Sequence, residues 1–124
     1  MSTILRSRRA LLAAVVALPA LVTVRHAVAH HGWGGYVPDP LRVFDGTVRS
    51  VRFVNPHAEI DLEAAGQTLR IVLAPPSRMT ARGLPDGTLQ AGQTVQVQGY
   101  PSREDPREVR AERIVVAGRP VELR

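Results

Sequence analysis

The short period of the apolar residues is the feature that most constrains the fold of this chain. Apolar side chains fall at every second position in the segments 57–63, 69–73 and 94–98. A period of two puts alternate side chains on opposite faces of a β-strand, whereas a helix needs a period near 3.6. We therefore expect short strands with one apolar face, and we expect that face to be buried at Leu69, Ile71, Leu73, Val95 and Val97.

The remaining segments complete the predicted order of elements. A strand is expected over 45–55, but Val48 and Val51 are three positions apart, which indicates a bulge or a bend. A short helix is expected at about 78–82, with Ser77 as its N-cap and Gly83 after its end. Strands at about 109–116 and 121–123 follow.

Three strands, a short helix and two further strands are the order of a five-stranded Greek-key barrel of the OB type. A strand that bends can serve both sheets of such a barrel. An immunoglobulin-like sandwich would need about seven strands and no central helix. We therefore predict an all-β, OB-like barrel over residues 45–124, with one short helix between strands 3 and 4, preceded by a segment at 30–44.

Residues 1–29 have the composition of a signal peptide. Three arginines open this leader, an apolar run follows at 10–24, and Ala-Val-Ala stands at 27–29, as a signal-peptidase site requires. The stretch Ser-Arg-Arg-Ala-Leu-Leu also resembles a twin-arginine signal, so both the general secretory route and the twin-arginine route are open. An uncleaved anchor is the alternative, although the apolar run is shorter than the roughly 20 residues of a membrane span.

Removing the leader changes the meaning of the charge. The whole chain has 16 basic and 11 acidic residues, but four of the arginines lie in the leader, so the remaining 124 − 29 = 95 residues carry 12 basic against 11 acidic side chains. This balance argues against a nucleic-acid partner. The chain has no cysteine, which excludes disulfides and thiolate metal sites.

Several motifs resemble, in order, those of a family of small exported bacterial proteins known only as a domain of unknown function. They are HHGWGGY, DGTVRSVRFVNPHAEI, LAPPSRMTARGL, GQTVQVQGYPSR and RAERIVVAGRPVELR. The His-His start and the Asn-Pro-His triplet are the most specific of them. In the family an aromatic residue often stands one position before Asn-Pro-His, whereas Val54 separates Phe53 from the triplet here. The resemblance implies an exported OB-like domain and no particular activity.

Cleavage after Ala29 would turn the backbone nitrogen of His30 into a free amine. The amine and the His30 ring could then chelate a transition metal, and a further imidazole from His57 could complete a histidine brace. His31 is the competing ligand, because an Xaa-His terminus also binds Cu(II). Imidazole and amine nitrogens favour copper, with zinc as the less expected ion.

Other residues have simpler interpretations beside their functional ones. Glu59 and Asp61 share the predicted face of His57 and could supply oxygen ligands, although acids are ordinary on an exposed strand face. Trp33 and Tyr36 are expected to hold the N-terminal segment on the barrel and so to position His30.

The sequence predicts a periplasmic or secreted small β-barrel protein that binds copper through His30, His57 and His31. The alternative is a non-enzymatic module that binds a ligand or another protein of the cell envelope without metal. Neither a serine–histidine–acid spacing nor a glycine-rich phosphate loop is present, so an enzyme is the less expected class. After cleavage of the leader we expect no stable insertion into a membrane.

Overall fold

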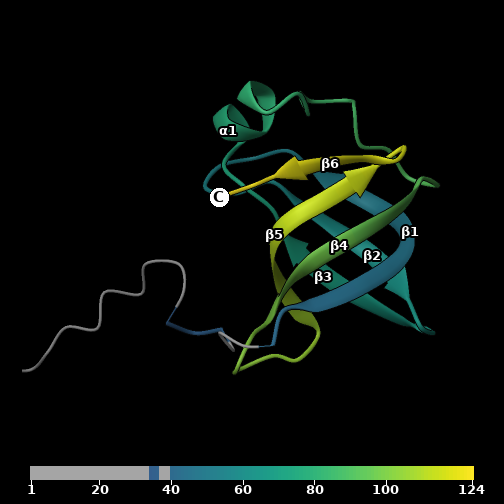
Figure 1. The fold of residues 1–124 in the computed structure, drawn as a ribbon, viewed down its shortest axis with the longest axis vertical. Helices are drawn as coiled ribbons and strands as arrows, with labels where there is room; N and C mark the ends of the chain where they lie inside the picture. The colour runs from purple at the N-terminus through teal and green to yellow at the C-terminus, as the bar shows by residue number, and fades with distance from the viewer. Residues whose placement is uncertain (1–33, 37–39) are drawn as a thin grey trace, which may run out of the picture.

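The computed structural model describes residues 34–36 and 40–124, which form strands and one short helix (Figure 1). The leader, His30, His31 and Trp33 lie outside these residues. Within residues 34–36 and 40–124, no helix is long and apolar enough to cross a membrane. The elements are β1 (Arg42–Arg52), β2 (Glu59–Ala64), β3 (Gln67–Val72), α1 (Pro76–Ala81), β4 (Thr94–Pro101), β5 (Glu108–Val116) and β6 (Arg119–Glu122).

Five of the strands close into a barrel. β1 pairs antiparallel with both β2 and β4, β2 pairs with β3, and β4 pairs with β5. A parallel pairing of β3 with β5 completes the ring, and β6 pairs with β5 outside it. This arrangement confirms the predicted all-β, OB-like barrel, including the helix between strands 3 and 4.

The first strand bends because it belongs to two pairs. Its residues from Arg42 to Thr47 pair with β4, and those from Thr47 to Arg52 pair with β2. Where the second pairing begins, Val48 lies opposite Leu62 and Ser50 lies opposite Asp61, which leaves Arg49 as the extra residue of a bulge. The break predicted from the valine spacing is thus confirmed. The strand begins three residues before the expected start, because its first residues pair with β4.

Alternating side chains fill the barrel, as the period of two predicts. Leu69, Ile71, Leu73, Val95 and Val97 are all buried. They belong to one apolar core whose largest fully buried members include Ile60, Leu62, Ile114 and Leu123. Side chains at the alternate positions of the same strands face outward, so the outer surface of the barrel carries the polar groups.

The short helix covers one end of the barrel, next to β6 and the C-terminus (Figure 1). Its Met79 is fully buried in the core. The expectation that Ser77 caps the helix is wrong, since Pro75 is the N-cap residue and no side chain caps the helix by a hydrogen bond. Proline has no N–H and a fixed φ, so it begins a helix without a capping side chain. Gly83 has the left-handed φ of +87° expected after a helix end.

Candidate functional site

His57 lies on the short link between β1 and β2. It follows Pro56 and immediately precedes Ala58, whose backbone N–H donates to Ala74 O at 2.8 Å and whose carbonyl accepts from Leu73 N at 2.9 Å. These two bonds fix the backbone beside His57 at the edge of the barrel. His57 is half-buried, so the residue is partly accessible from solvent, as a metal ligand requires.

Tyr36 holds the N-terminal segment against the barrel. Its backbone forms a β-bridge with Ser102, and its hydroxyl donates to the Glu108 carboxylate. Arg103 binds the same segment twice, through its backbone N–H to Gly35 O at 2.7 Å and through its Nε to Tyr36 O at 3.2 Å. The anchoring role predicted for Tyr36 is confirmed, while Trp33 lies outside the described residues.

A bulge in β5 helps to position the C-terminal residues Leu123 and Arg124. Gln98 pairs with Arg113 and Gly99 pairs with Ala111, so Glu112 is the extra residue of β5. The carbonyl of Glu112 accepts the backbone N–H of Leu123 at 2.8 Å. Because the Leu123 side chain is fully buried, this bond and the core together fix the start of the Arg124 side chain.

Three arginines from distant parts of the chain meet at this face, and we call Arg78, Arg110 and Arg124 the arginine cluster. Arg78 Nη1 and Arg124 Nη1 both donate to Leu123 O, at 3.4 and 3.2 Å. Arg124 Nη2 also donates to Leu73 O at 2.8 Å, next to the bonds that fix His57. Two guanidinium groups thus share one carbonyl oxygen.

Arg110 is the buried member of the arginine cluster. Only 8% of this residue is exposed, and its guanidinium carbon lies 5.9 Å from the centroid of the Tyr36 ring, a cation–π distance. Burial lowers the pKa of Arg110, while the nearby Tyr36 and Glu112 raise it. Burial, followed by the charge of Arg110, lowers the pKa of Arg124 to about 10. Arg124 therefore stays charged at neutral pH.

The electrostatic surroundings of His57 favour its neutral form. Burial lowers the pKa of its imidazole, and the charges of Arg110 and Arg124 lower it further. Glu59 acts in the opposite direction, and Arg78 adds to the lowering. A neutral imidazole offers a nitrogen lone pair to a metal ion, whereas a protonated one does not.

The lowered pKa of His57 predicts a pH-dependent stability. Below about pH 6.5, the usual histidine pKa, the unfolded chain takes up a proton that folded His57 does not bind. This contribution to stability is therefore present above that pH and is lost as the pH falls through the lower folded pKa. His57→Asn should flatten the loss, which thermal unfolding between about pH 7 and 5 would measure. Equal slopes for the parent and the variant would assign the loss to other groups.

Glu59 and Asp61, the two acids predicted to share the face of His57, both pair with Arg52. Arg52 binds Glu59 Oε2 and Asp61 Oδ2, each at 3.0 Å, and Ser50 Oγ donates to Asp61 at 2.7 Å. Glu59 and Asp61 thus form part of an ion-pair network on the outer surface. Within 34–36 and 40–124, no group of three or more His, Asp or Glu residues could hold a metal ion.

The arginine cluster was not predicted from the sequence, since its members come from α1, β5 and the C-terminal residue. One local signal for it exists. The buried residues Val109, Ala111 and Ile114 are spaced by two and then by three positions, the same irregularity that revealed the bulge in β1. Such a break would have placed a bulge at Glu112.

Comparisons with known proteins place this chain among uncharacterised relatives. The model of a family of unknown function, DUF6152, matches residues 19–110. No curated protein matches the chain significantly. A ZRD-deleted mutant of TiaS in complex with agmatine is 14% identical, with a TM-score of 0.48 over 60% of this chain. A TiaS complex with tRNA, AMPCPP and agmatine is also 14% identical, with a TM-score of 0.47 over 61%. The matched part spans 20% and 18% of those two chains.

Proposed function

The chain belongs to the DUF6152 family of unknown function, and we propose that it is an exported protein that binds copper through its mature N-terminus. In this proposal, cleavage after Ala29 frees the amine of His30. The amine, the His30 ring and the His57 ring then bind one ion. His31 is the alternative ligand to His57, and zinc is the alternative ion.

The observation that carries this proposal is that Tyr36 and His57 share Arg110 as a neighbour. The guanidinium of Arg110 lies 5.9 Å from the Tyr36 ring centroid, and its charge also acts on His57. The anchored Tyr36 and His57 are therefore both within electrostatic reach of Arg110. Tyr36 is six positions after His30, and an extended chain of that length reaches about 20 Å. This reach supports a common ion for His30 and His57.

The cost of the site is smaller than the affinity expected for it. At pH 7, deprotonating an amine with a pKa near 7.7–8.0 costs about 1–1.4 kcal/mol. The arginine cluster also repels a doubly charged cation, and in water each guanidinium at roughly 4 Å from the ion would cost about 2 kcal/mol. Metal affinities of small protein sites are on the order of 10 kcal/mol or more. Copper binding is therefore favourable, and it should weaken as the pH falls.

Titration of the metal-free, exported protein with Cu(II) tests the proposal, after intact mass has shown that the chain begins at His30. His57→Ala should weaken binding at least about tenfold, or roughly 1.4 kcal/mol, because one imidazole ligand is lost. One extra residue before His30 should weaken it comparably, since the amine moves away from the His30 ring. Gln67→Ala is the matched control, because Gln67 is exposed at the far end of β2 and β3.

The same titration separates the two candidate sites. A terminal Xaa-His site would be insensitive to His57→Ala and would depend on His31 instead. Parent-like affinity in the His57 variant therefore contradicts the brace. Absence of any copper binding by protein with the correct N-terminus would contradict copper binding altogether and favour the interaction module.

A further inference from the structure

We propose that the arginine cluster, with His57 and Tyr36 beside it, binds a small doubly charged oxyanion such as hydrogen phosphate or a phosphate monoester. This site needs no metal and no free N-terminus. It therefore goes beyond the proposed copper binding, and His57 lies beside both sites.

The geometry of the cluster suits an oxyanion. Arg78 and Arg124 are held side by side, because both donate through Nη1 to Leu123 O, at 3.4 and 3.2 Å. Each guanidinium is a planar fork of N–H donors, and two adjacent forks can grip the oxygens of one tetrahedral anion. Arg124 is further fixed by its bond to Leu73 O at 2.8 Å. The donors are thus positioned before any ligand arrives.

Arg110 is the buried part of the arginine cluster, and its side chain packs beside Tyr36. Arg110 is 8% exposed, and its guanidinium carbon lies 5.9 Å from the Tyr36 ring centroid. Tyr36 is itself held by Glu108, and burial followed by that hydrogen bond raises the pKa of its hydroxyl to about 12. The phenol therefore stays neutral and adds no negative charge to the site.

The mutual repulsion within the arginine cluster favours an anion as its ligand. Arg78, Arg110 and Arg124 act on one another, and Glu112 is the carboxylate that acts on both Arg110 and Arg124. Three guanidinium groups thus lie within electrostatic reach of one another. Gathering cations in a partly buried place costs free energy. A dianion would reduce their mutual repulsion and form charge-assisted hydrogen bonds at the same time.

Titration calorimetry of metal-free protein with inorganic phosphate tests this site, with acetate and chloride as separate arms. We expect saturable binding of one phosphate, at least about tenfold tighter than acetate. Arg78→Gln should weaken phosphate binding about tenfold or more. Arg78 is exposed, so this variant should fold, which circular dichroism would verify. Arg124→Gln is a second variant with the same expectation.

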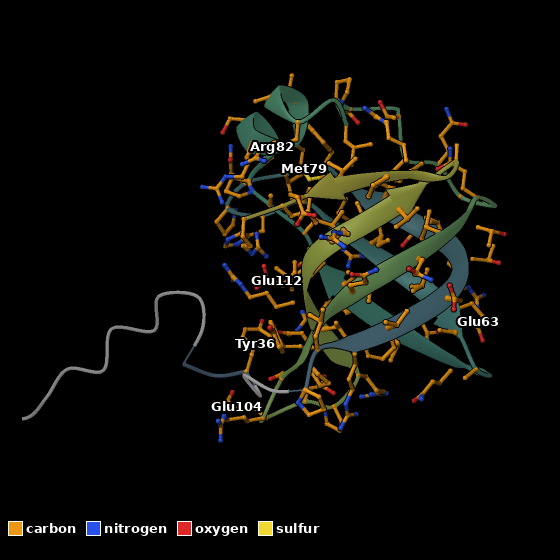
Figure 2. All side chains as sticks on the ribbon, viewed as in Figure 1. Tyr36, Glu63, Met79, Arg82, Glu104 and Glu112 are labelled. Atoms are coloured by element: carbon orange, nitrogen blue, oxygen red, sulfur yellow. The ribbon has the colours of Figure 1, made fainter. Side chains whose placement is uncertain are left out.

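Arg49→Gln is the matched control. Arg49 pairs with Glu63 at 3.0 Å, and Figure 2 shows Glu63 on the side of the barrel away from Tyr36 and Glu112. The Arg49→Gln substitution removes one positive charge without touching the arginine cluster, so phosphate affinity should stay within about twofold of the parent.

Absence of saturable phosphate binding would overturn the proposal. An equal loss in Arg49→Gln and Arg78→Gln would also overturn it, because the effect would then be that of net charge alone. Equal affinities for phosphate and acetate would refute the assignment to a dianion. None of these outcomes depends on copper, so they are distinguishable from a failure of the histidine site.

Discussion

Gly99→Ala should lower the free energy of unfolding by about 3 kcal/mol or more. A Cβ on Gly99 would lie 2.3 Å from Arg110 O and 3.0 Å from the Cα of Ala111. Both contacts are with backbone atoms of β5, so no side chain can rotate away and the strand must shift. The shift would occur at the bulge that positions Arg110 and Glu112. Urea unfolding followed by circular dichroism would measure the loss.

Gly34→Ala is the control for this prediction. A Cβ on Gly34 meets no atom within 4 Å, and its φ is not among the positive values. The free energy of unfolding of Gly34→Ala should therefore equal that of the parent within about 0.5 kcal/mol. A Gly99 variant as stable as the Gly34 variant would show that β4 and β5 do not approach so closely at the bulge.

Ile71→Ala should cost about 2–5 kcal/mol, the range for removing a large buried aliphatic side chain. Ile71 is fully buried and lies at the seam where the barrel closes, opposite Ile60 of β2 and Val109 of β5. Truncation leaves a cavity between two pairs of strands, and the closed ring limits how far they can collapse into it. Thermal or urea unfolding of the variant would give the cost.

The matched control is Val43→Ala, which truncates an aliphatic side chain that is 55% exposed. It should change stability by less than about 0.5 kcal/mol. Comparable losses in the Ile71 and Val43 variants would contradict the assignment of Ile71 to the core of a closed barrel.

Much of the fold could be predicted because strand faces are local information. The alternation around Ile71 identifies a strand and its buried face, and the valine spacing in 48–51 identifies the bulge in β1. Positions that depend on a partner were predicted less well. The start of β1 at Arg42 is set by pairing with Gly99 and Gln98 in β4, which no local pattern encodes.

The candidate site, too, could be predicted from the sequence only in part. The anchoring role of Tyr36 could be predicted from neighbouring residues in the chain. His57 was expected to begin the strand over 57–63, but it lies on the link before β2, which begins at Glu59. The arginine cluster could not be predicted, because Arg78 and Arg124 meet at the carbonyl of Leu123, 45 positions from Arg78 in sequence. That contact depends on the pairing of Leu123 with Glu112 and on the burial of Leu123, both of which are tertiary features.

Electron paramagnetic resonance of the copper-loaded, exported protein tests the central claim most directly, because nitrogen ligands split the Cu(II) signal according to their number. The account predicts the His30 amine nitrogen and two imidazole nitrogens in the parent protein. In His57→Asn, whose fold should be intact, one imidazole nitrogen should be lost. A spectrum that His57→Asn leaves unchanged would contradict a copper site built from His30 and His57.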